Sequence, residues 1–141
     1  MTSEPALCFQ ISEIKNTTGR PPCPRILAAS SVIRNLDDQP LLVIHGGRND
    51  GIFNGTQNVA LNDVNVLNLV TLEWTQLAIY GIQPASRWGH MIVPNRQFHP
   101  DGIVVFGGVN LQSYCFGDIK TLQILSFGKK PQQQELVEPR T

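Results

Sequence analysis

The stretch GIQPASRWGHMIV, which runs from Gly81 to Val93, has a counterpart earlier in the chain, GRPPCPRILAASSV from Gly19 to Val32. Glycine, proline and arginine recur with the same spacing, first as Gly19, Pro22 and Arg25 and then as Gly81, Pro84 and Arg87. A short run of strand-forming residues comes after the arginine each time. A pattern that occurs twice in this way predicts two copies of one structural unit.

The segments around this repeat have the patterns of β-strands. LLVIHGG (residues 41–47) and GIVVFGG (residues 102–108) are short apolar runs rich in β-branched residues, and each ends in a pair of glycines. DVNVLNL (residues 63–69) and DIKTLQIL (residues 118–125) alternate apolar and polar residues, as half-buried strands do. No segment has a sustained helical period. The sequence therefore predicts an all-β fold.

The strands have the same order in both copies. An arginine is followed by a strand, a double glycine, a loop and an aspartate that opens the next strand, Asp63 in one copy and Asp118 in the other. Trp74 lies in a fourth strand of the first copy, whereas Lys129 stands at the corresponding position of the second. Four antiparallel strands in a unit of about fifty residues are typical of a propeller blade. We predict a first blade at residues 19–80 and a second at 81–127, whose outer strand is less well defined.

The two ends of the chain fall outside these units. We interpret residues 1–18 as a candidate outer strand of a preceding blade, centred on residues 8–14. The polar, proline-containing segment at residues 128–141 is expected to be a tail or linker.

The ordered set of motifs resembles the kelch repeat of the galactose oxidase-like propellers. The likeness lies in the double glycine, the aspartate, Trp74 and the Gly-x-x-Pro-x-x-Arg-x-Gly-His approach to the second unit, although Ala28 stands where the second copy has His90. It implies a partial kelch-type β-propeller of about two four-stranded antiparallel blades plus an N-terminal strand. Since a closed propeller has about four to eight blades, further blades are expected from a longer chain or from other subunits.

The motif residues are expected to have structural roles. Glycines at strand ends allow positive φ or a close approach of another backbone, and a tryptophan fits a wedge between blades. Arginine, histidine and aspartate at recurring positions predict buried hydrogen bonds that tie one blade to the next. The residues assigned to this structural set are Gly46, Gly47, Asp63, Trp74, Arg87, His90, Gly107, Gly108 and Asp118.

Composition and motifs argue against several functions. Lys plus Arg balance Asp plus Glu at 11 each, so we expect neither nucleic acid nor membrane as a partner. The chain lacks a basic start followed by an apolar run, which favours a cytoplasmic location. Its three histidines and two tyrosines are scattered, and it contains no nucleophile elbow or P-loop. We therefore expect no catalytic residues, metal or cofactor, and no enzyme activity.

Loops on a rigid scaffold are where binding usually occurs. The longer loop at residues 48–61 and the shorter one at 109–116 both come directly after a double glycine. Our candidates for partner contact are Arg48, Asn49, Asp50, Phe53, Asn54, Asn110, Gln112 and Tyr114. The sequence thus predicts a non-catalytic protein–protein interaction scaffold. Two alternatives stay open: a homo-oligomeric lectin-like propeller, and the regulatory propeller portion of a larger enzyme.

Overall fold

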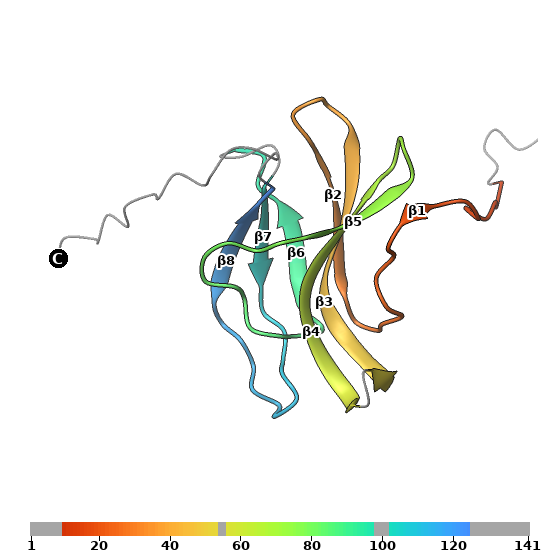
Figure 1. Cartoon of the computed structure of the whole chain (residues 1–141). Coiled ribbons are helices and arrows are strands. Elements are labelled where there is room, and N and C mark those ends of the chain that lie inside the picture. Colours follow the sequence, from red (N-terminus) through yellow and green to blue (C-terminus); the bar gives the residue numbers. More distant parts are fainter. Residues whose placement is uncertain (1–9, 54–55, 98–101, 125–141) are drawn as a thin grey trace, which may run out of the picture.

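The computed structural model describes residues 10–53, 56–97 and 102–124. These residues form eight strands and no helix (Figure 1), so they contain no helix that is long and apolar enough to span a membrane. The strands are β1 (Thr18–Gly19), β2 (Ala29–Arg34), β3 (Pro40–Phe53), β4 (Thr56–Asn68), β5 (Glu73–Leu77), β6 (Met91–Pro94), β7 (Gly102–Phe106) and β8 (Ile119–Gln123). The all-β prediction is confirmed.

The strands form two sheets, one from each repeat unit. The first sheet has the order β1-β5-β4-β3-β2, and the second has the order β6-β7-β8. Neighbouring strands are antiparallel except for β1, which pairs in parallel with the outer strand β5. The two sheets pack against each other (Figure 1), and β2 of the first sheet contacts β6 of the second.

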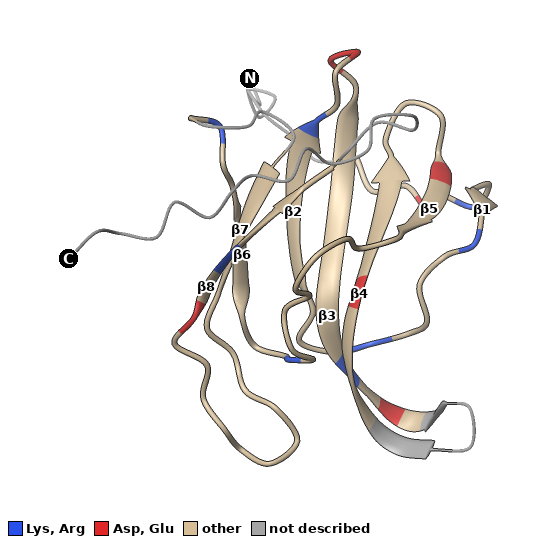
Figure 2. Cartoon of the chain, turned by 60° about the vertical axis from the view of Figure 1, so that its left-hand side comes forward, with Lys and Arg blue, Asp and Glu red and all other residues tan. Residues whose placement is uncertain are grey.

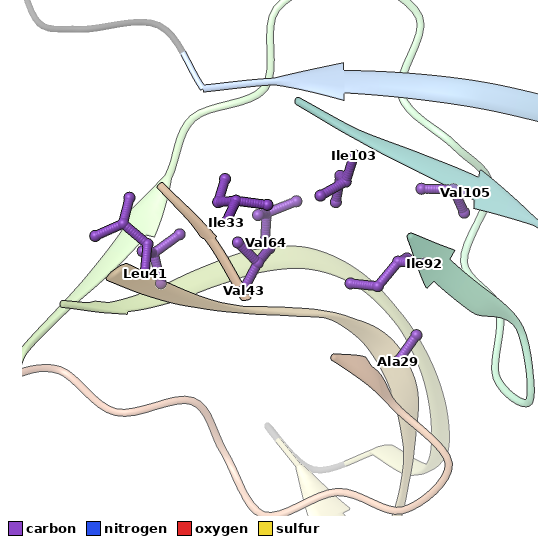
Figure 3. Packing of buried hydrophobic residues seen from close by; sticks show 9 residues of the cluster. Ala29, Ile33, Leu41, Val43, Val64, Ile92, Ile103 and Val105 are labelled. Carbon is purple, nitrogen blue, oxygen red and sulfur yellow. The ribbon is translucent and has the colours of Figure 1, made fainter. Parts of the chain in front are cut away.

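The hydrophobic core lies between the sheets. Apolar side chains from one face of the first sheet meet those from one face of the second (Figure 3), because side chains alternate across each strand. The buried members are Ala29, Ile33, Leu41, Val43, Val64 and Val66 from the first sheet and Ile92, Ile103 and Val105 from the second. This burial fixes the two sheets face to face.

One strand is more deeply buried than its sequence pattern predicts. Alternation over residues 63–69 predicts that Asn65 faces solvent, but its exposed fraction is only 2%. The side chain is accommodated because Asn65 Nδ2 donates a hydrogen bond of 2.6 Å to Asp63 Oδ2. A buried amide is tolerated when it has such a partner, so β4 is buried on both faces.

The segment predicted as a long loop after the first double glycine is largely a hairpin. β3 continues through Gly46 and Gly47 to Phe53, and β4 begins at Thr56. Gly46 and Gly47 have φ values of 62° and 97°, and register shifts occur after His45 and Asn49, so bulges carry the pairing past the glycines. Residues 48–61 are thus mainly paired strand, and Asn54 lies outside the described residues.

The second double glycine does end its strand. β7 stops at Phe106, and the chain continues through Gly107 and Gly108 as a loop held by isolated bridges from Val109 to Trp88 and to Cys115. The second sheet has three strands within the described residues. The region around Lys129 and the predicted tail at 128–141 lie outside them.

Residues 10–14 are not in a strand within the described part of the chain, and the outer strand of a preceding blade at residues 8–14 stays a prediction. The earlier residues of that segment lie outside the described part of the chain. β1 is made by Thr18 and Gly19, which align with Glu73 and Trp74 of β5. β1 is therefore the edge strand of the first sheet, beside β5.

Candidate interaction surface

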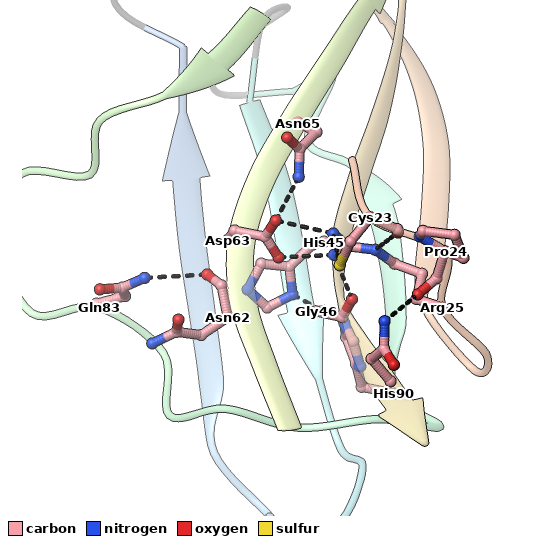
Figure 4. Close-up of polar contacts among 11 residues, drawn as sticks. Cys23, Pro24, Arg25, His45, Gly46, Asn62, Asp63, Asn65, Gln83 and His90 are labelled. Carbon is pink, nitrogen blue, oxygen red and sulfur yellow. Dashed lines mark hydrogen bonds and ion pairs between the residues drawn. The ribbon is translucent and has the colours of Figure 1, made fainter. Parts of the chain in front are cut away.

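Each repeat unit contains an arginine clamped by its own aspartate. In the first unit, Arg25 Nη1 and Nη2 donate to the two carboxylate oxygens of Asp63 at 2.6 Å and 2.9 Å, and Nη1 also donates to the carbonyl of Gly46 at 2.9 Å (Figure 4). In the second, Arg87 makes the same contacts with Asp118, at 2.7 Å and 2.9 Å, and with the carbonyl of Gly107, at 3.1 Å. These bidentate pairs fix the start of each segment that comes after a double glycine.

Both carboxylates stay ionised at neutral pH. Burial acts to raise the pKa of Asp63, but hydrogen bonds from Arg25 and Asn65 outweigh it, so that the pKa is lowered. The hydrogen bond from Arg87 lowers the pKa of Asp118. Arg87 and Asp63, which the sequence pattern grouped as ties between blades, belong to different clamps, and each clamp lies within one unit.

Among the described residues, three backbone hydrogen bonds join the second unit to the first. The N–H of Gly47 donates to the carbonyl of Arg87 at 2.9 Å, and the N–H of Arg87 donates to the carbonyl of Leu61 at 3.1 Å. The N–H of Gly89 donates to the carbonyl of Leu27 at 2.9 Å. The segment that enters the second unit is therefore bonded to the double glycine and the hairpin base of the first.

A buried histidine pair lies at the same junction. His45 Nδ1 and His90 Nε2 are 2.8 Å apart with the rings nearly perpendicular, so one nitrogen donates and the other accepts. The remaining nitrogens, His45 Nε2 and His90 Nδ1, are buried and have no partner in the part of the chain that is described. Burial, the neighbouring histidine and Arg87 lower the pKa of His45 to about 4. Burial and Arg87 lower the pKa of His90 to about 4. Both rings are neutral at pH 7.

Sequence reasoning missed two members of this framework. Arg25 is not among the residues assigned to the structural set, although its alignment with Arg87 is a usable signal. The position of His45 directly before Gly46 and Gly47 suggests a residue at the end of a strand, but its side chain is completely buried. A polar residue inside the apolar run LLVIHGG was the available hint. His99 lies outside the described residues.

Trp74 does not lie at the junction between the two units. It aligns with Leu67 across β4 and β5, one position out of step with the core residues Val64 and Val66, so its side chain is on the face of the first sheet that points away from the second. Trp74 is partly exposed. It does not wedge between the two sheets.

The candidate contact residues of the first unit lie on the projecting part of β3. Arg48 forms an ion pair with Asp50, in which Nη2 is 3.1 Å from Oδ2, and its guanidinium lies 5.1 Å from the centre of the Trp88 ring. Asn49 Nδ2 donates to the carbonyl of Pro24 at 2.7 Å, so this amide supports the hairpin. The side chain of Phe53 lies outside the described residues.

The candidates of the second unit form a compact turn. Asn110 Oδ1 accepts hydrogen bonds from the backbone N–H groups of Gln112 and Tyr114, each at 3.0 Å. Tyr114 is 62% exposed, and its ring meets the Phe116 ring edge to face at 5.3 Å between the ring centres. Phe116 in turn lies 4.0 Å from the guanidinium of Arg87. The exposed Tyr114 ring is therefore connected to the guanidinium of Arg87 through Phe116.

The two segments project from the same end of the molecule. In Figures 1 and 2 the outer part of the β3–β4 hairpin and the loop between β7 and β8 both extend toward the bottom of the view. Figure 2 also shows acidic and basic residues scattered over strands and loops. Within the described ranges, no group of three or more His, Cys, Asp or Glu residues is placed to hold a metal ion.

No family model matches the chain. Kelch domain-containing protein 2 of Bos taurus is 31% identical over 105 residues, which are 74% of this chain and 22% of that protein. This similarity indicates a kelch-like relation. Two proteins of Arabidopsis thaliana, acyl-CoA-binding domain-containing proteins 4 and 5, are each 26% identical over 88% and 98% of the chain. The chain covers 17% and 20% of these two, so it spans about a fifth of the length of the curated relatives it matches.

Proposed function

We propose that this chain is part of a kelch-type β-propeller that acts as a non-catalytic protein-interaction scaffold. The similarity to a kelch-domain protein and the two sheets with matching clamps support this proposal. In a propeller, further blades would complete the ring. The chain would then contribute two adjacent blades and their loops.

The observation that carries the proposal is the placement of two dissimilar segments at one end of similar sheets. The hairpin and the Asn110 loop both come after a double glycine. In each pair, the carbonyl of the first glycine accepts a hydrogen bond from the arginine of the clamp. A rigid base with variable projections is how scaffolds commonly present binding residues. Each clamp anchors a projection to its own sheet, and the backbone hydrogen bonds between the units keep the two projections in a constant relation.

Arg48 and Tyr114 are the proposed anchors. Arginine and tyrosine are enriched among residues that dominate interface energies. Arg48 is preoriented by Asp50 and Trp88, and Tyr114 by Phe116, so each loses less side-chain freedom on binding. A protein partner that contacts both would bridge the two units.

The test is quantitative affinity purification with the full chain. The double variant Arg48→Ala with Tyr114→Ala is compared with wild type and with Tyr80→Ala, which removes a 73% exposed ring from the connector between the sheets. We expect proteins captured by wild type and Tyr80→Ala to bind the double variant about tenfold less tightly, or about 1.4 kcal/mol. Equal capture by a double variant with an unchanged circular dichroism spectrum would contradict the proposed surface.

A further inference from the structure

The two sheets differ in how one equivalent face is covered. In the first sheet, a row across β2, β3 and β4 faces the core and is buried: Ala29, His45 and Val64 are 6%, 0% and 5% exposed. The matching row across β6, β7 and β8 is exposed: Met91, Phe106 and Ile119 are 58%, 45% and 70% exposed. The second sheet covers this face of the first sheet, but the equivalent apolar face of the second sheet is exposed.

The backbone groups that receive the second unit also have counterparts. Gly47, Leu61 and Leu27 bond to the entering segment, and their equivalents by repeat position are Gly108, Phe116 and Gly89. The N–H of Gly108 and the carbonyls of Phe116 and Gly89 have no hydrogen-bond partner among the described residues. The exposed face therefore carries the same set of bonding groups, unoccupied by the part of the chain that is described.

The space beside the first glycine of each pair is filled in the first unit and open in the second. A Cβ atom on Gly46 would lie 2.7 Å from the carbonyl oxygen of Arg87, because the entering segment passes there. A Cβ atom on the equivalent Gly107 would meet nothing within 4 Å. The room that the second unit takes up beside the first is open beside the second.

The other end of the molecule offers matching groups. The N–H and carbonyl of Arg25 and the N–H of Leu27 occupy the repeat positions of the bonding groups of Arg87 and Gly89, and they have no partner within the described ranges. Leu27 has a φ of 55° and Gly89 a φ of 65°, so the two entering segments share a backbone conformation. Leu42 and Ile44, which correspond to Ile103 and Val105, are only partly buried.

We propose that a second copy of this chain docks on the exposed face of the second sheet. The outer face of the first sheet of one copy packs on Met91, Phe106 and Ile119 of the other, and its Arg25 and Leu27 backbone groups bond to Gly108, Phe116 and Gly89. The contact joins two different surfaces, so the copies associate head to tail. It rests on the observed junction between the two units and is independent of any partner of the loops.

Sedimentation velocity on the full chain tests the contact. We expect wild type to associate at concentrations up to about 100 μM, and Ile119→Asp to weaken association at least about tenfold. Ile82→Asp is the matched control, since Ile82 is 87% exposed and lies in the connector between the sheets. Circular dichroism verifies that each variant is folded. A monomeric wild type, as expected if only further units of a longer chain fill this face, would overturn the proposal.

A mixing experiment distinguishes head-to-tail docking from other association. Val32→Asp changes the outer face of the first sheet, where Val32 aligns with Leu42, and is expected to be monomeric like Ile119→Asp. The two variants retain opposite intact faces, so an equimolar mixture is expected to form a one-to-one dimer. Failure of the mixture to dimerise, or association of either variant alone as strong as that of wild type, would overturn the proposed contact.

Discussion

The two repeat units share a framework but differ in the segment that extends from the double glycine. In both, an arginine binds an aspartate and the first glycine carbonyl with nearly the same distances. After Gly47 the first unit extends into a paired hairpin, whereas after Gly108 the second forms a turn around Asn110. The comparison shows that the clamp determines where a projection starts and leaves its form to the local sequence.

The largest expected effect comes from removing a clamp. Arg87→Ala removes a fully buried guanidinium and leaves the carbonyl of Gly107 and the 34% exposed Asp118 carboxylate without their partner. It should lower the free energy of unfolding by about 3 kcal/mol, the lower end of the range for a buried pair, because water reaches the remaining carboxylate. Arg25→Ala should have a similar effect because its contacts are equivalent. Urea denaturation measures both, with the exposed Arg20→Ala as control, expected within about 0.5 kcal/mol of wild type. If only one of the two variants lost stability, the two clamps would not be equivalent.

The histidine pair predicts acid sensitivity at the junction. Because both pKa values are lowered from 6.5 to about 4, the unfolded chain binds protons first as the pH falls. The contribution of the neutral histidines to the free energy of unfolding is fully present above pH 6.5. It decreases as the pH approaches 4, by up to roughly 3 kcal/mol for one histidine. The Asp63 and Asp118 clamps, whose pKa values are lowered from 3.8, weaken only at lower pH.

The matched variant carries the residues of the other unit. His45→Phe with His90→Ala introduces the residue types that stand at the equivalent positions, Phe106 and Ala28. The double variant therefore lacks both titrating rings. Thermal unfolding between pH 6.5 and 4.5 should then be nearly independent of pH, while wild type loses stability. An equally steep pH dependence in the double variant would place the sensitivity elsewhere.

A smaller difference is expected between equivalent glycines. Gly46→Ala and Gly107→Ala both place a side chain at positive φ, which costs about 1–2 kcal/mol each. Only Gly46 lies against the backbone of the entering segment, so its substitution should destabilise by about 1–3 kcal/mol more, as overpacking does. Chemical denaturation of both variants at low protein concentration measures the difference. Equal losses would contradict the closer packing beside Gly46.

The smallest expected effect concerns the turn of the second unit. Asn110→Ala removes the acceptor of two backbone N–H groups on an exposed loop and should cost about 1 kcal/mol. Asn110→Asp retains the acceptor and serves as the matched variant. Differential scanning calorimetry should show a lower midpoint for Asn110→Ala alone. Identical midpoints for the two variants would mean that the turn holds its shape without this side chain.

Short-range patterns were enough to predict the strands and the repeat. The apolar runs before Gly46 and Gly107 and the alternation after Asp63 reflect side-chain period and turn chemistry, which are local properties. The paired hairpin over residues 48–61 was not predictable in this way. Its polar side chains suit a loop equally well, and the pairing depends on bulges that come after His45 and Asn49.

The clamps and the junction were only partly predictable. Recurrence marked Arg87, His90 and Asp63 as buried polar groups, but spacing does not tell which arginine meets which aspartate across the sheet. The pairing of His45 with His90 joins residues far apart in sequence and exists only once the two sheets pack. Such contacts depend on tertiary packing, which a single sequence pattern does not contain.

The confinement of each Arg–Asp clamp to one unit has a consequence for how such a chain changes over evolutionary time. A unit that carries its own anchor keeps its projection in place after duplication, because the anchor is copied together with the segment that it holds. Substitutions, insertions and deletions between Gly108 and Asp118 would then alter one recognition element without disturbing its neighbour. Local anchoring makes each unit a transferable module, whose surface diverges while its attachment is inherited unchanged.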